Sequence, residues 1–149
     1  MSEQAFRLPQ EAIDQSHYLS ILSRAPADEV KSFVDRLIPD LGAIEVIQNR
    51  TGLVMASMVD TAQGATFYLG EVLVAEAHVR LDAAEGYAAC LGRDLEQALA
   101  IALIDAALVA GRARQRIDPF IHTQAAALEA AEQRLLEAIE ATRVEMETF

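Results

Sequence analysis

Cysteine is almost missing from this sequence, since Cys90 is the only one in 149 residues. A single cysteine excludes an internal disulfide framework, and it excludes any zinc or iron-sulfur site of the CxxC type built by this chain alone. Long apolar runs are missing as well, because no segment approaches the roughly 20 apolar residues that span a bilayer. These absences favour a soluble globular protein with no membrane partner.

Positive charge is also scarce. The chain has 12 Lys and Arg residues, of which only Lys31 is a lysine, against 23 Asp and Glu, and its net charge is -11. Most of the surface would therefore repel nucleic acid and anionic membranes. The N-terminus has no basic stretch followed by an apolar one, so we expect no signal peptide and a cytoplasmic location.

Apolar sequence is plentiful, because 52% of the residues are hydrophobic in a chain of the size of one domain. Such a chain can bury a substantial core. Apolar residues recur at helical spacing over residues 9–25 and again over residues 27–38, and Pro26 and Pro39 are expected to end these two helices. The sequence thus predicts two amphipathic helices at its start.

A strand pattern follows after Gly42. Residues 44–47 and 53–59 predict two strands of a hairpin that turns at residues 49–52, and the second strand is apolar on both faces, as expected of a covered central strand. Residues 66–81 predict a long strand with a bulge at Gly70, and residues 87–91 a fourth strand. We therefore expect a four-stranded, mainly antiparallel sheet.

Two further helices complete the pattern. Asp94 can cap a helix that runs to Ala110, and this helix is apolar almost all round, as expected of an element covered on both sides. Asp118 and Pro119 can open a last helix that runs nearly to Phe149, about 45 Å at about 1.5 Å per residue. Its narrow apolar seam consists of Ile121, Leu128, Leu135, Ile139 and Met146. A domain of this size cannot bury such a seam alone, so we expect a partner protein to cover part of it.

The sequence offers one candidate ligand-binding cluster. Alternation along residues 71–81 places Glu76, His78 and Arg80 on one face of a strand, where an acid, an imidazole and a guanidinium can hold an anion or move a proton. The same pattern is typical of the solvated face of a half-buried strand. We found no nucleotide-binding, zinc-protease or nucleophile-elbow motif.

The remaining candidates favour structural or interface roles. Arg93 precedes a helix and is expected to pair with an acid within this chain or on a partner, while Asp94 occupies the cap. Asp105 lies on an apolar stripe of the same helix, so its carboxylate needs an arginine, backbone donors or an interface. Cys90 is expected to be an inert packed thiol. His17, His78 and His122 lie far apart in sequence and indicate no metal site.

Three arginines follow the apolar helix. Arg112, Arg114 and Arg116 are expected to interact with the dipole at its C-terminus.

Several of these segments together resemble the PhnG family of bacterial carbon-phosphorus lyase systems. The resemblance is carried by residues 50–55, 67–74, 77–81, 86–87, 91–94, 102–106 and 142–145. Ala75 and Glu76 depart from the threonine-arginine pair that we associate with many members, which weakens a ligand-binding role for this strand face.

The resemblance implies an accessory subunit that acts with the H, I and L components when an alkylphosphonate displaces adenine from MgATP, giving a ribose 1-phosphonate 5-triphosphate. It implies assembly with a PhnI-like subunit above all, and with PhnH-like and PhnJ-like subunits. It assigns no catalytic residue to this chain, and it implies that MgATP is a substrate of the assembly rather than a cofactor bound by the chain itself.

Taken together, the sequence predicts one α+β domain over residues 1–149, of order ααββββαα, whose residues 117–149 form an extended partner-binding helix. Two alternatives stay open. One is a stand-alone hydrolase or nucleosidase that uses Glu76, His78 and Arg80, and the other is a homodimeric ligand-binding module.

Overall fold

The computed structural model describes residues 13–144, and within them it has four helices and one three-stranded antiparallel sheet. The elements in chain order are α1 (Gln15–Arg24), α2 (Ala27–Leu41), β1 (Ile44–Val59), β2 (Thr66–Leu81), β3 (Ala84–Leu91), α3 (Leu95–Val109) and α4 (Arg114–Ala141). The α+β class and the order of the helices are confirmed. The expected fourth strand is wrong.

Strand β1 explains the missing strand, because the two strands expected over residues 44–59 are one. It pairs with β2 along its whole length, with an irregularity between Val46 and Gln48. Residues 49–52, interpreted as a turn, lie within the strand, and Arg50 faces Glu76 across the pair. Arg50 lies on the uncovered face of the sheet, whereas Asn49 and Thr51 lie on the α3 side, opposite Ala77 and Ala75. The chain instead turns back near Gly64, where φ is 66°.

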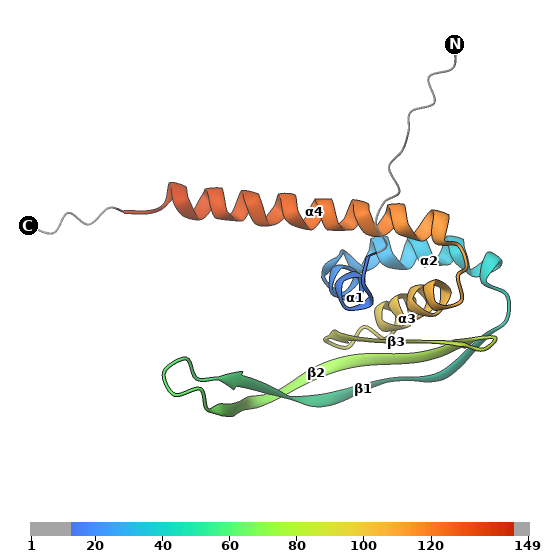
Figure 1. Cartoon of the computed structure of the whole chain (residues 1–149), viewed down its shortest axis with the longest axis horizontal. Helices are drawn as coiled ribbons and strands as arrows, with labels where there is room; N and C mark the ends of the chain where they lie inside the picture. The colour runs from blue at the N-terminus through green and yellow to red at the C-terminus, as the bar shows by residue number, and fades with distance from the viewer. Residues whose placement is uncertain (1–12, 145–149) are drawn as a thin grey trace, which may run out of the picture.

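The far end of the β1–β2 pair has no third strand, because β3 pairs only with residues 74–81 of β2. We call residues 53–73 the distal ribbon, and Figure 1 shows it extending beyond α1, α2 and α3. None of its residues is buried, so the expectation that residues 53–59 form a covered central strand is wrong. The expected bulge at Gly70 is confirmed by a register shift and by a φ of 148° at this glycine.

Helix α3 is the centre of the core. One side packs on β2 and β3 and the other on α1 and α2, as Figure 1 shows. The expected cap is confirmed, since the Asp94 side chain accepts a hydrogen bond from the main-chain N–H of Gln97 at 3.0 Å. Ten of its residues are buried, Asp105 among them, which confirms the expectation from its all-round apolar sequence.

Glycine at position 86 allows β3 to approach α3 closely. A Cβ atom there would lie 2.2 Å from the carbonyl oxygen of Ala102 and 2.4 Å from the amide nitrogen of Ala106. No side chain fits in that space.

Helix α4 begins at Arg114, earlier than the expected opening at Asp118 and Pro119. Burial of Ile117 together with Ile121 explains the early start, because both side chains then face the core from one side of the helix. Pro119 lies in the second turn of the helix. Because proline has no N–H, one carbonyl in the first turn lacks its helical hydrogen-bond donor.

The same helix ends at Ala141, short of the expected end near Phe149. The hydroxyl of Thr142 donates to the carbonyl of Ile139 at 2.9 Å, which occupies an acceptor that a continuing helix would use. Residues 145–149 lie outside the described part of the chain. We call residues 129–141 the distal half of α4, in which every residue is exposed.

The two N-terminal helices are confirmed with shifted ends. Helix α1 begins at Gln15, and the expected start at residues 9–12 lies outside the described residues. Helix α2 continues through Pro39 to Leu41, because Leu41 is fully buried and Gly42, with φ 78°, follows as the stop.

Candidate functional site

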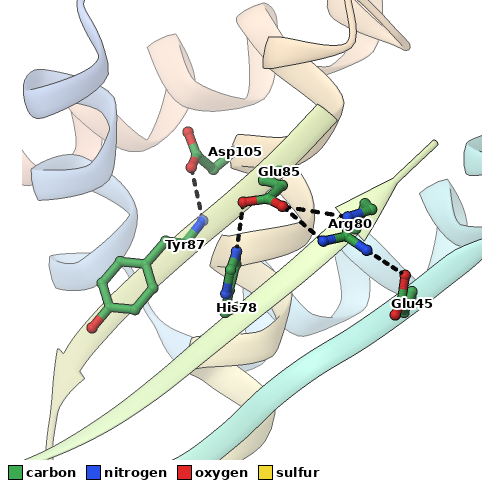
Figure 2. A network of polar contacts seen from close by, with 6 residues as sticks. All are labelled: Glu45, His78, Arg80, Glu85, Tyr87 and Asp105. Atoms are coloured by element: carbon green, nitrogen blue, oxygen red, sulfur yellow. Dashed lines mark hydrogen bonds and ion pairs between the residues drawn. The ribbon is translucent and has the colours of Figure 1, made fainter. Parts of the chain in front are cut away.

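The structure places Glu76, His78 and Arg80 side by side on the open face of β2, away from α3. This confirms the alternation expected from the sequence, since Ala75, Ala77, Val79 and Leu81 between and beside them are fully buried. Strand pairing adds residues from β1 and β3 to the same face, and Figure 2 shows several of them.

Arg80 lies between two carboxylates from neighbouring strands. Its Nη1 atom donates to Glu45 of β1 at 3.0 Å, and its Nη2 atom donates to Glu85 of β3 at 2.9 Å (Figure 2). The Nε2 atom of His78 lies 3.0 Å from the other oxygen of Glu85. Arg80, followed by His78, lowers the pKa of Glu85 below its usual value.

Glu76 forms a second part of this network. It accepts one hydrogen bond from the Tyr87 hydroxyl at 2.6 Å and another from Nε of Arg50 at 2.6 Å. These two donors lower the pKa of Glu76, while the hydrogen bond to Glu76 raises the pKa of Tyr87. Each of the three candidate residues therefore already has a partner on a neighbouring strand.

The network connects the three strands rather than opening a cavity. An anionic ligand at Arg80 would have to displace Glu45 or Glu85, and the Nε2 atom of His78 is engaged by Glu85. The sequence reasoning missed Glu45, Arg50, Glu85 and Tyr87 as members of this cluster. Tyr87 and Glu85 could have been found from their position just after the β2–β3 turn, because a hairpin brings them opposite residues 78 and 80.

Asp105 lies beneath the sheet, on the other side from this network, and is 2% exposed. Its Oδ1 atom accepts hydrogen bonds from the Tyr18 hydroxyl at 2.5 Å and from the Gln15 side chain at 2.9 Å, and its Oδ2 atom accepts one from the main-chain N–H of Tyr87 at 3.0 Å. Burial, followed by the hydrogen bond to Asp105, raises the pKa of Tyr18.

These contacts decide the role of Asp105. Of the donors expected from the sequence, the backbone N–H is found, but no arginine contacts this carboxylate in the described part of the chain. Three uncharged donors hold it instead, and together they join α1, α3 and β3.

Asp94 and Arg93 differ in their contacts. Asp94 caps α3 and also accepts from Lys31 of α2, with Nζ and Oδ2 2.8 Å apart, which lowers the pKa of Asp94. Arg93 is exposed, and it makes no ion pair with any residue of the described range. The expected acid partner of Arg93 is therefore absent from residues 13–144.

Two of the three arginines after α3 contact the end of α2 rather than that of α3. Arg112 donates to the carbonyl of Leu41 at 2.5 Å and pairs with Asp82 in the β2–β3 turn. Arg116 pairs with Asp40 at 2.5 Å. Arg114 lies 3.8 Å from Asp118 within its own helix. None of these contacts is with the C-terminus of α3, so the expected interaction of the three arginines with its dipole is wrong.

Cys90 is buried at 4% exposure on β3, and burial raises the pKa of its thiol, as expected of a packed cysteine. Over residues 13–144 no three His, Cys, Asp or Glu side chains gather in a way that could hold a metal ion. Nor does any helix in that range combine the length and apolarity needed to cross a bilayer.

The largest departure from an ordinary domain surface is uncovered apolar area. Side chains in the distal ribbon that are both large and well exposed are Leu53, Val54, Met55, Met58, Val59, Phe67, Tyr68, Leu69 and Leu73. In the distal half of α4, Leu135, Leu136 and Ile139 are between 57% and 61% exposed. Figure 1 shows that both segments extend toward the same end of the molecule.

The fold and these surfaces define a small α+β protein whose polar cluster is satisfied within the chain and whose apolar surface is open to a partner. The chain belongs to the PhnG family, because the family model described as "Phosphonate metabolism protein PhnG" matches residues 14–149. It is also 32% identical over 132 residues to the alpha-D-ribose 1-methylphosphonate 5-triphosphate synthase subunit PhnG of Rhizobium meliloti (strain 1021), covering 88% of this chain and 85% of that relative.

Proposed function

We propose that this chain is an accessory subunit of an alpha-D-ribose 1-methylphosphonate 5-triphosphate synthase, within a carbon-phosphorus lyase system. There it would act with H, I and L components when an alkylphosphonate displaces adenine from MgATP. The single observation that supports this proposal most strongly is similarity to the Rhizobium meliloti synthase subunit over 88% of the chain.

The polar network supports an accessory rather than a catalytic role. Glu76, His78 and Arg80 are each engaged by a side chain of a neighbouring strand, as expected of residues that hold the three strands together. We therefore assign the binding of MgATP to other subunits of the assembly. Because MgATP is a metabolite of the cytoplasm, we place the protein there.

The distal half of α4 supports assembly with other subunits. Residues 114–128 pack on the body of the domain through Ile117, Ile121 and Gln124. Every residue of 129–141 is exposed, and Glu132 forms an ion pair with Arg24 of α1 at 2.8 Å. We propose that the partner-binding part of the expected segment 117–149 begins near residue 129. A PhnI-like subunit is the first partner that we propose, followed by PhnH-like and PhnJ-like subunits.

The test is reconstitution of the synthase from separately purified components. Formation of the ribose 1-phosphonate 5-triphosphate from MgATP and methylphosphonate is followed by ³¹P NMR, with and without this chain. We expect product only when the chain is present, and none from the chain alone. Full activity without the chain would refute the proposal. Turnover by the chain alone that is lost in His78→Ala would instead establish the stand-alone hydrolase.

A further inference from the structure

The distal ribbon presents large apolar side chains on both of its faces. Over residues 53–59 of β1, side chains alternate between the two faces of the sheet. Leu53, Met55 and Val59 therefore point to the side that continues the helix-covered face, while Val54 and Met58 point to the open face. Across the strands, Leu73 joins the first set and Phe67 the second.

This two-sided exposure is unusual for a domain of this size. Large contiguous apolar patches on a folded protein mark sites of association. A two-stranded ribbon that packs on nothing is also marginally stable in water. Contact on one face alone would leave the apolar side chains of the other face in water, so a stable arrangement covers both faces.

The charges of the chain argue against a second copy as the cover. The distal ribbon carries Asp60 and Glu71 and has no Lys, Arg or His. The distal half of α4, the other exposed apolar segment, has four glutamates and one arginine, Arg134. Two copies of a chain with a net charge of -11 would bring acidic segments together, whereas a basic partner would be attracted to them.

We propose that the distal ribbon inserts into an apolar groove of a different polypeptide, which covers both faces of the ribbon and brings basic residues close to Asp60 and Glu71. This inference rests on the proposed function, because it takes the partner to be another subunit of the synthase assembly. It adds the segment that makes the contact, the two-sided mode of contact and the charge of the partner surface.

The experiment measures affinity between this chain and the remaining subunits of the assembly, purified together, by analytical ultracentrifugation. Val54→Glu changes the open face of the ribbon and Val59→Glu the opposite face. Val109→Glu, at the end of α3, is the matched control, since Val109 is 57% exposed and Val59 is 60% exposed. We expect each ribbon variant to weaken binding at least tenfold, about 1.4 kcal/mol, and the control to bind within about twofold of the wild type.

A second set of variants tests the charge of the partner surface. Asp60→Lys and Glu71→Lys together should weaken binding, and wild-type affinity should fall as salt concentration rises. Val59→Thr, which keeps the shape of the side chain, repeats the apolar test with a milder change. Circular dichroism establishes that each variant keeps its fold.

The outcomes separate this inference from the proposed function. Wild-type binding that both ribbon glutamates leave unchanged overturns the inference and leaves the proposed function standing. Weakening by only one of them overturns two-sided insertion. Stronger binding of the double lysine variant overturns the basic partner. A dimer of the chain alone that Val59→Glu dissociates would assign the ribbon to a second copy. If the wild-type chain binds no subunit, the proposed function itself fails.

Discussion

Replacing Asp105 by alanine should destabilise the protein strongly, although no charged partner is lost. The carboxylate is 2% exposed and accepts from Tyr18, Gln15 and the main chain of Tyr87. Alanine removes all three acceptor contacts at once. Gln15 lies at the surface and can turn to water, but the hydroxyl of Tyr18, a residue only 6% exposed, and the N–H of Tyr87 would lose their partner inside the protein.

The expected loss of unfolding free energy follows from these two donors, which are left without an acceptor. A buried donor left without an acceptor costs about 1–3 kcal/mol, so the pair costs about 2–6 kcal/mol of unfolding free energy. Because a domain of this size has a total stability of about 5–15 kcal/mol, the loss should be visible in any equilibrium assay.

Urea unfolding followed by circular dichroism measures this loss, with Asp35→Ala on the exposed face of α2 as the control. Tyr18→Phe completes a double-mutant cycle. In the wild type it removes a hydrogen bond to a carboxylate and should cost about 1.5–3 kcal/mol. In the Asp105→Ala background, Tyr18→Phe removes a hydroxyl that has no acceptor, and it should cost nothing or stabilise the fold.

Two results would refute this reasoning. A loss below about 1 kcal/mol for Asp105→Ala would mean that the three contacts contribute little or are replaced by water. Strict additivity in the cycle would mean that Tyr18 and Asp105 act independently.

Three other predictions follow from the core. Folding raises the pKa of Tyr18 from its ordinary value of 10.0, so the stability that its neutral phenol contributes is complete below pH 10 and is lost as the pH rises through the folded-state pKa. Alkaline unfolding of Tyr18→Phe should therefore show a slope shallower by up to about 1.4 kcal/mol per pH unit, and an unchanged slope contradicts this. Gly86→Ala should cost about 3 kcal/mol or more in urea unfolding, because its Cβ would meet the carbonyl of Ala102, whereas Gly52→Ala, with nothing within 4 Å of its Cβ, should cost far less. Equal losses would refute the close-packing argument. Cys90 should react with a thiol reagent such as DTNB only as fast as the protein opens, because its side chain is 4% exposed and the reagent cannot reach it in the folded state, and rapid reaction of the folded protein would contradict that assignment.

Local signals in the sequence predicted the parts of the fold that depend on neighbours in the chain. Helix α3 is one example, since its cap needs only Asp94 and Gln97, three residues apart. The β1 strand is the opposite case. Residues 49–52 have the composition of a turn, and what keeps them extended is pairing with residues 74–77 of β2, which no local pattern reveals.

The same distinction applies to the candidate site. Alternation along β2 was enough to predict that Glu76, His78 and Arg80 share one face. The partners of His78 and Arg80, which are Glu45 and Glu85, depend on the register between the three strands. No local pattern in the sequence reveals that register. Asp105 was predicted to need hydrogen-bond donors. One of them, Tyr18, lies 87 residues away in the chain, so which residue donates depends on how α1 packs against α3.

The contact between Asp105 and Tyr87 also has a consequence for how the sheet can be extended. An incoming strand beside β3 would need the main-chain N–H of Tyr87, and that donor is already committed to a buried carboxylate. Strand β1 is the other outermost strand, and it has a neighbour on one side only. Continuation of the sheet into another chain is therefore disfavoured at Tyr87 of β3, whereas β1 and the part of β2 that extends beyond β3 keep an outer edge that can accept it.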